Sequence, residues 1–152
     1  MNREEIMREA LRLAGEAAEN SEVPVGCVIT DREGNIIGRG RNRREEARDA
    51  TAHAEMEAIR EACEAVGDWR LDGCSIFVTL EPCPMCAGAI VQARVGRVVY
   101  GADDPGQGCA GSVYRIPEDP AFPHFCPCDG GVLAGDCRAK LSRFFARLRR
   151  ER

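Results

Sequence analysis

The chain of 152 residues is 44% hydrophobic and 30% charged, which is the composition of an ordinary globular protein. Its length suits one domain, so we expect residues 1–152 to fold as a single unit. No apolar run approaches the ~20 residues that a membrane-spanning helix needs, and the N-terminus opens directly into a helical pattern instead of a signal peptide. These features exclude a helical membrane protein and predict a cytoplasmic location.

The net charge of −4 is unevenly distributed along the chain. Residues 136–152 carry a net charge of +5, which leaves −9 for residues 1–135. A basic end on an acidic body is one feature of nucleic-acid-binding proteins, although a solvated helix face is the simpler interpretation of such a charge run. The charge pattern alone does not decide between the two.

The nine cysteines do not indicate a disulfide framework, because such frameworks are typical of short secreted chains. Cys27, Cys63 and Cys74 fall within apolar patterns, and we expect them to be small buried hydrophobic residues. Cys83 and Cys86 have the Cys-x-x-Cys spacing of a metal site or a redox dithiol.

Helical and strand periodicities alternate in the first half of the chain. Residues 3–19 place apolar side chains at helical spacing and predict an amphipathic helix. Residues 23–30 and 36–42 are short apolar runs separated by a turn, which predicts an antiparallel hairpin. Thr51 is the expected N-cap of a second helix that runs to Val66. Its buried stripe would comprise Met56, Ile59, Ala62, Cys63 and Val66.

The second half continues the alternation of strands and helices. The expected elements are a strand over 74–80, a helix from Pro84, a strand over 96–101, a long loop with one helical turn over 102–131, a weak strand near 124–128 and a helix over 134–150. The last helix should bury Leu133, Leu141, Phe144, Phe145 and Leu148. A hairpin followed by strand–helix–strand units predicts a mixed sheet with helices on both faces and parallel pairing in its second half.

Two short motifs carry the chemistry of the chain: His53-Ala54-Glu55 and Pro82-Cys83-Pro84-Met85-Cys86. Two thiols and one imidazole are three ligands for Zn²⁺, and a three-ligand zinc keeps its fourth position open for water, as in catalytic sites. Glu55 follows the histidine closely enough to transfer protons without binding the metal. A structural zinc would need a fourth protein ligand, and a redox dithiol would leave His53 and Glu55 without a role.

This pattern, H-x-E followed by P-C-x-x-C, is typical of the zinc-dependent nucleobase deaminases. Zinc lowers the pKa of bound water from ~15.7 to about 7, which generates a nucleophile at neutral pH. Glu55 would accept a proton from that water, deliver it to a ring nitrogen and later help to protonate the leaving ammonia. Partial burial would suit this role, because it raises the pKa of a carboxyl towards neutrality.

Similar segments extend well beyond the motif. They are Glu22-Val-Pro-Val-Gly26, Thr51-Ala-His-Ala-Glu55, Val78-Thr-Leu-Glu-Pro-Cys83, Met85-Cys-Ala-Gly-Ala-Ile90, Arg97-Val-Val-Tyr-Gly-Ala-Asp-Asp104, Gly111-Ser112, Gly131-Val-Leu133 and Phe144-Phe145. On these segments residues 23–145 resemble the bacterial tRNA-specific adenosine deaminases of the cytidine deaminase superfamily. The resemblance implies an α/β fold, a three-layer α/β/α sandwich with a five-stranded mixed sheet. It also implies a homodimer that converts adenosine to inosine at the wobble position of a tRNA anticodon loop.

The resemblance also implies roles for individual residues. One zinc ion per subunit would be held by His53, Cys83 and Cys86, with Glu55 as the proton shuttle. The substrate nucleoside would meet Asn42 and Asp104, and RNA contacts would come from Phe145, Arg147 and Arg149 of the last helix. A single-stranded loop suits such a pocket, because its bases can be splayed out for chemistry.

The chain departs from the family pattern at a few positions. Gly106 stands where the family usually has lysine, Pro123 replaces the usual asparagine, and Ala50 replaces a common proline. The segment Cys126-Pro127-Cys128 has no counterpart in the pattern and no physical explanation. The first two departures leave a deaminase of a free base or nucleoside, guanine or cytidine, as the alternative function. A catalytically idle RNA-binding protein is a third hypothesis, which the intact motif opposes.

Overall fold

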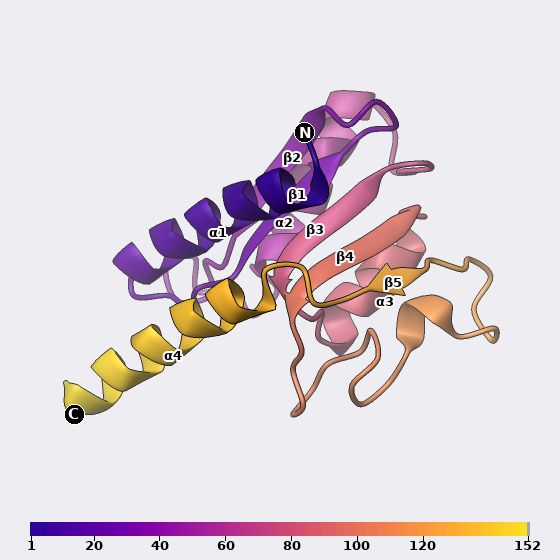
Figure 1. The fold of residues 1–152 in the computed structure, drawn as a ribbon. Helices are drawn as coiled ribbons and strands as arrows, with labels where there is room; N and C mark the ends of the chain where they lie inside the picture. Colours follow the sequence, from indigo (N-terminus) through magenta and orange to yellow (C-terminus); the bar gives the residue numbers. More distant parts are fainter. Residues whose placement is uncertain (152) are drawn as a thin grey trace.

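One mixed sheet of five strands runs through the middle of the protein, shown in Figure 1 by a computed structural model that describes residues 1–151. The strands are β1 (Gly26–Thr30), β2 (Ile36–Arg41), β3 (Ser75–Leu80), β4 (Arg97–Ala102) and β5 (Cys128–Asp129). Their order in the sheet is β2-β1-β3-β4-β5. Strand β1 pairs antiparallel with β2 and β3, whereas the β3–β4 and β4–β5 pairs are parallel. The predicted hairpin and the predicted parallel pairing are both confirmed.

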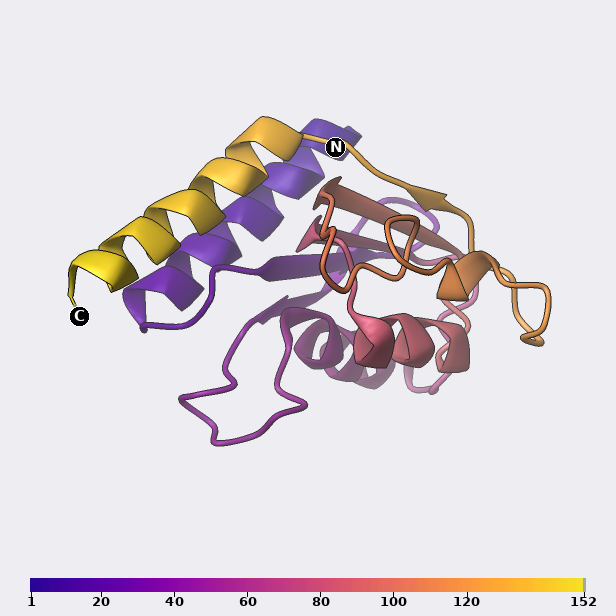
Figure 2. The ribbon, with the colours of Figure 1, turned by 90° about the horizontal axis from the view of Figure 1, so that it is seen from below.

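Helices cover both faces of this sheet. They are α1 (Arg3–Glu19), α2 (Ala54–Val66), α3 (Pro84–Gln92) and α4 (Ala134–Arg150), with one 3₁₀ turn, η1 (Ile116–Glu118), in the long loop. Figure 2 shows α1 and α4 side by side on one face and α2 and α3 on the other. The predicted three-layer α/β/α sandwich is therefore confirmed. None of the helices in residues 1–151 is long and apolar enough to cross a membrane.

The two faces of the sheet carry separate hydrophobic clusters. Strand β3 shows why: Ile76 and Val78 pack in the cluster under α2 and α3, whereas Phe77 packs in the cluster under α1, because successive side chains of a strand point to opposite faces. Cys27 and Cys74 belong to the first cluster, and Cys63 packs at its edge. These three cysteines therefore lie in apolar surroundings, as predicted.

Helix α2 lies unusually close to the hairpin, because β2 carries glycines where the two elements meet. A Cβ atom on Gly40 would come within 2.1 Å of the carbonyl oxygen of Ala54, and one on Gly38 would come within 2.4 Å of that of Ala58. No side chain fits in such a space. Helix α2 presents alanines to these glycines, so the backbone of the helix packs almost directly on the backbone of β2.

The start and the buried face of α2 differ from the sequence-based prediction. The helix begins at Ala54 with His53 as its N-cap, whereas Thr51 belongs to a turn in which its N–H and hydroxyl both donate to Asp49 Oδ1, at 2.8 and 2.7 Å. The buried side chains are Ala54, Glu55, Ala58 and Ala62. Val66, predicted to be buried, is exposed, because the glycine-lined hairpin accepts the alanine face.

The last helix has the predicted bounds, but it buries fewer side chains than its pattern suggested. Phe144 and Cys137 are buried, Leu133 and Leu141 are half-buried, and Phe145 and Leu148 are exposed. Figure 1 shows the reason: α4 leaves the sheet after its first turns and continues alongside α1. Three smaller differences are that β1 begins at Gly26, that β5 is only two residues long, and that Arg152 of the basic end lies outside the described residues.

Candidate active site

Two helix starts meet at one end of the sheet and carry the residues of the zinc motif. His53 is the N-cap of α2, and Cys83 is the N-cap of α3. Pro84 occupies the first turn of α3, where its missing N–H is no loss, and Cys86 follows in the same turn. Because β3 ends at Leu80, the short connection fixes where α3 begins.

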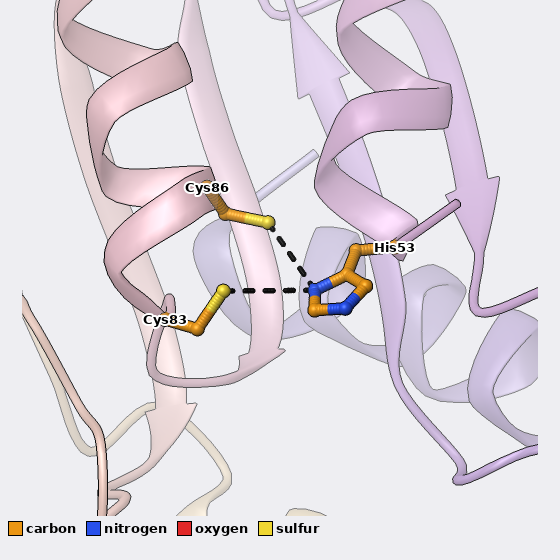
Figure 3. A group of neighbouring side chains, drawn as sticks. All are labelled: His53, Cys83 and Cys86. Carbon is orange, nitrogen blue, oxygen red and sulfur yellow. Dashed lines mark hydrogen bonds between the residues drawn. The ribbon is translucent and has the colours of Figure 1, made fainter. Parts of the chain in front are cut away.

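The three predicted ligand side chains converge on one point (Figure 3). The imidazole Nδ1 of His53 lies 3.6 Å from Sγ of Cys83 and 3.5 Å from Sγ of Cys86, and all three ligand atoms lie within 4.8 Å of one another. Ligand bonds of about 2.3 Å to sulfur and 2.05 Å to nitrogen in a tetrahedral site place these atoms about 3.6 Å apart. The spacing of the three ligand atoms is therefore the spacing that one shared tetrahedral cation requires. The donor set fits Zn²⁺.

The electrostatics of this group favour a thiolate. Hydrogen bonding from Cys86, and then from His53, lowers the pKa of Cys83 to about 4. The same contact with Cys83, together with burial, raises the pKa of Cys86 strongly, and hydrogen bonding to Cys83 raises the pKa of His53. Cys83 is thus held as a thiolate by neighbours that keep their protons, and a metal ion would displace those protons, since thiolates and neutral imidazole are the groups that bind zinc.

Glu55 lies in the first turn of α2 with only 4% of its surface exposed. Burial raises its pKa to about 7, against the opposing effect of a backbone hydrogen bond. A carboxyl group with a pKa near neutrality is able both to accept and to give a proton at physiological pH. This is the environment that the sequence-based hypothesis required of the proton shuttle.

A cleft of about 420 Å³ opens above this group and is lined by residues from six parts of the chain. Its lining residues are Val23, Val25, Asn42, Arg44, His53, Ala54, Glu55, Leu80, Glu81, Cys83, Asp103, Asp104, Gln107, Leu141 and Phe145. The structure therefore brings both predicted nucleoside-binding residues and one predicted RNA contact to the zinc motif. Cys86 lies buried beneath the cleft.

Asn42 and Asp104 are held in place by their own neighbours. The side-chain amide of Asn42 donates to the carbonyl of Val23 at 3.3 Å and accepts from the N–H of Arg44 at 3.2 Å. One amide hydrogen of Asn42 is then left for a substrate. Oδ1 of Asp104 accepts from the N–H groups of Gly106 and Gln107 at 3.0 and 3.3 Å, which leaves its second oxygen outside the turn.

Comparison with known proteins places the chain in a family. The cytidine and deoxycytidylate deaminase zinc-binding region matches residues 1–102. The tRNA-specific adenosine deaminase of Bacillus subtilis (strain 168) is 46% identical over 153 residues, which cover 100% of this chain and 94% of that protein. The chain belongs to the tRNA-specific adenosine deaminase family. The expected family and its zinc dependence are confirmed, and the chain is a zinc-dependent deaminase.

Solved structures agree with this family assignment. A structure from a study of A-to-I editing by tRNA:A34 deaminases at the wobble position superposes with a TM-score of 0.86 at 43% identity, covering 90% of this deaminase and 99% of that chain. A guanine deaminase from Bacillus subtilis is also 43% identical, with a TM-score of 0.64, but the match covers 68% of this chain and 66% of that one. The likeness to the tRNA:A34 deaminase structure is thus the more complete of the two.

Two buried carboxylates of the deaminase had no role in the sequence analysis. Glu22 accepts hydrogen bonds from the N–H groups of Glu45 and Glu46, at 3.1 and 2.7 Å, and so holds the loop that leads to His53. Glu81 holds the loop that carries Asp104. Each lies inside a segment shared with the family, next to apolar residues, and an acidic side chain in such a place is the signal that would have revealed them.

The two arginines predicted to contact RNA lie outside the lining of the cleft. Arg147 donates to the carbonyl of Ala18 at the end of α1 at 3.1 Å, and its guanidinium lies 5.8 Å from the ring of Phe144. Arg149 lies four residues beyond Phe145 and so on the same side of α4. Their roles stay predictions, and the geometry favours Arg149.

Removal of a ligand should release the metal, whereas removal of the proton shuttle should not. We expect Cys86→Ala to lose both bound zinc and turnover. Glu55→Gln should keep a full complement of zinc while kcat falls by about 10²- to 10⁴-fold, the usual contribution of a general acid–base group. The zinc-to-protein ratio from mass spectrometry and ammonia release measure the two effects. Cys63→Ala removes a thiol outside the cleft and should change neither. Full zinc in Cys86→Ala would contradict the ligand assignment.

Proposed function

We propose that this protein hydrolyses the amino group of the wobble adenosine in a tRNA anticodon loop, leaving inosine. The observation that carries the proposal is the cleft of about 420 Å³ that unites the zinc motif and Glu55 with the face of α4 that bears Phe145. A free base would contact only the floor of this cleft, formed by the zinc motif and Glu55. A nucleotide within an RNA strand would also contact the rim, the outer edge that includes Phe145. Likeness to the tRNA-specific deaminases over the whole chain supports the same conclusion.

We assign the zinc ion to Nδ1 of His53 and the sulfurs of Cys83 and Cys86. When bound there, it lowers the pKa of water and so supplies a nucleophile at neutral pH. The carboxylate of Glu55 accepts a proton from the water that attacks C6 of adenine, and gives it to ring nitrogen N1. The same carboxylate then takes the second proton, from the hydroxyl group now on C6, and gives it to the exocyclic amino group. The bond from C6 to that nitrogen breaks, ammonia leaves and the C6 carbonyl of inosine forms. The pKa of Glu55 near 7, raised by burial, suits a group that takes and gives protons in turn.

The wall of the cleft positions the nucleoside. The remaining amide hydrogen of Asn42 and the outer carboxylate oxygen of Asp104 are the polar groups that we assign to the base and ribose. Phe145, 40% exposed at the rim, offers an aromatic face on which a neighbouring unpaired base can stack. A splayed-out anticodon loop presents its base to such a site at little energetic cost.

Positive charge on α4 supplies the contacts to phosphate. Arg149 lies on the side of Phe145, and within residues 1–151 no carboxylate lies within 4.0 Å of its guanidinium. Arg147 is engaged with the end of α1 and with Glu151, at 3.9 Å. We therefore assign a phosphate contact to Arg149 and expect a smaller part for Arg147.

We further propose that the chain folds as a single domain, and that two copies of it form a homodimer in the cytoplasm. Four large apolar side chains of the long loop between β4 and β5 are exposed: Val113, Tyr114, Phe122 and Phe125. Tyr114 and Phe125 leave 64% and 61% of their surface exposed. Exposed apolar groups concentrated on one loop are typical of an interaction surface, and a second copy can offer the same surface in a two-fold arrangement.

The alternative is a deaminase of free guanine or cytidine. Gly106 at the cleft loop and Pro123 farther along are exposed, and neither has a cationic or amide side chain to contact RNA. A guanine deaminase shares the fold. Because the zinc motif serves either substrate, activity measurements on RNA and on free bases decide between them.

The substrate assignment has a direct test. The zinc-loaded protein should convert the wobble adenosine of an anticodon stem-loop RNA to inosine, read by sequencing, and release one ammonia for each inosine. Free adenosine, guanine and cytidine should react with a kcat/KM lower by about 10²-fold or more, because the rim contacts are lost. Glu55→Gln and a stem-loop with guanosine at the wobble position are the controls. Ammonia from guanine without inosine in RNA would establish the alternative.

The two arginines of α4 should behave differently. We expect Arg149→Ala to raise KM for the stem-loop roughly three- to tenfold and to lower the salt dependence of binding by about 0.7 in log–log slope, the value for one phosphate contact on single-stranded nucleic acid. Arg147→Ala should leave that slope unchanged and lower the melting temperature instead, because it removes a contact to α1. An altered slope in Arg147→Ala alone would reverse the assignment.

The exposed loop should control the oligomeric state. Sedimentation velocity should find a dimer for the native chain and a shift to monomer for Tyr114→Asp combined with Phe125→Asp, because burial of an unpaired carboxylate opposes association. Trp69→Asp, at an exposed aromatic residue between α2 and β3, is the matched control and should stay dimeric. A native monomer would contradict the proposal.

A further inference from the structure

Glu81 lies two residues before the first cysteine of the motif and is 2% exposed, yet no step of the reaction uses it. Its carboxylate accepts four hydrogen bonds, two on each oxygen. Oε1 accepts from the N–H of Asp104 at 3.0 Å and from the hydroxyl of Ser112 at 2.5 Å. Oε2 accepts from the N–H groups of Ala110 and Ser112, both at 2.9 Å. Every donor belongs to the loop after β4.

The loop is folded tightly around this carboxylate. Gly108 approaches it so closely that a Cβ atom there would lie 2.3 Å from Cδ of Glu81. The N–H of Gly108 donates to the carbonyl of Asp104 at 2.8 Å, which closes the turn between the two. The loop has no regular structure, so its N–H groups donate to this carboxylate instead of to a neighbouring strand or helix. A loop held in this way is rigid.

The same loop forms one wall of the active-site cleft through Asp103, Asp104 and Gln107. Oε1 accepts from the peptide N–H of Asp104 and so fixes that peptide, while the side chain of Asp104 accepts from the next turn and fixes it. We propose that Glu81 is a positioning residue, which orients Asp104 towards the nucleoside by holding the 103–112 loop. The proposal deepens the proposed function and rests on it for the identity of the nucleoside.

Replacement of Glu81 by glutamine should remove one of the four hydrogen bonds and keep the others. One oxygen becomes an NH₂ group, which cannot accept from a peptide N–H. On the Oε2 side the NH₂ would face two peptide donors, whereas on the Oε1 side it faces only one, since the hydroxyl of Ser112 is able to turn and accept. The amide will therefore place its nitrogen on the Oε1 side, and the bond lost is the one to Asp104. Ser112→Ala does the reverse: it removes the hydroxyl and keeps the Asp104 bond.

Steady-state kinetics on the anticodon stem-loop test this distinction. Glu81→Gln should raise KM about tenfold, the size of one lost hydrogen bond, while zinc content and kcat stay within about threefold, because Glu55 and the ligands are untouched. Gly108→Ala adds a methyl group to the loop that would push the Glu81 carboxylate away, so this variant should show the same rise in KM. Ser112→Ala should change KM by less than about threefold. Glu118→Gln, whose carboxylate holds the N–H of Cys128 elsewhere in the long loop, is the control and should match the native protein.

Hydrogen exchange gives a readout that does not need a substrate. In Glu81→Gln the amide of Asp104 should exchange at least tenfold faster, while those of Ala110 and Ser112 keep their protection. Unchanged KM, with kcat falling in proportion to zinc or to folded protein, would show a purely structural role and overturn the proposal. If the native protein leaves the stem-loop untouched, the proposed function fails, and the exchange result still decides whether Glu81 positions Asp104.

Discussion

The close seating of α2 on the β1–β2 hairpin is the constraint on which the site depends. Ala54 lies between His53 and Glu55, and its carbonyl oxygen is the atom that a Cβ on Gly40 would approach to 2.1 Å. The contact that sets the distance from helix to sheet is therefore made by the residue between the proposed zinc ligand and the proposed proton shuttle. Metal sites tolerate deviations of only about 0.2 Å in ligand distance, so an alanine face packed on glycines, with no flexible side chain between, suits the requirement.

Three buried glutamates show how environment separates the tasks of identical side chains. Glu55 sits beside the ligands with little compensation for the loss of water, and burial raises its pKa to about 7. Glu22 and Glu81 are just as buried but accept hydrogen bonds from loop N–H groups. Burial alone would raise the pKa of Glu81, but its bonds to Ser112, Asp104 and Ala110 hold it below the usual value. Proton transfer and loop anchoring thus follow from the number of donors around each carboxylate.

Much of this architecture could be predicted from the sequence, and the misses share a physical cause. Helices over 3–19 and 134–150 have strong periodicity and several turns, so both were predicted with bounds close to those observed. The grouping of His53, Cys83 and Cys86 followed from motif spacing and ligand chemistry, and the structure brings these three side chains together. The buried face of α2 was predicted only in part: Ala62 is buried and Ile59 and Cys63 pack against the core, as expected. Ala54 and Ala58 were missed because alanine is a weak hydrophobic signal, and only the partner glycines make it the packing face. Phe145 and Leu148 were expected in the core because periodicity finds an apolar stripe without saying whether protein or solvent covers it. Hydrogen bonds that Glu81 accepts from a loop 23 or more residues away leave no local sequence pattern at all.

The rim and the floor of the cleft are formed by different kinds of structure. The residues at the floor of the cleft lie at the starts of α2 and α3, whereas the rim is built from loops and from a helix that extends past the sheet. Gly106 adds no cation there, so the positive charge at the cleft itself is that of Arg44, whose side chain lines one wall. Asp103 and Asp104 line the cleft as well, and a phosphate at that wall would be repelled. An RNA strand must then enter with its backbone towards Arg44 or the basic face of α4, whereas a neutral free base has no need of either. We infer that the charge of the rim, and not the zinc motif, orients a polyanionic substrate in this deaminase.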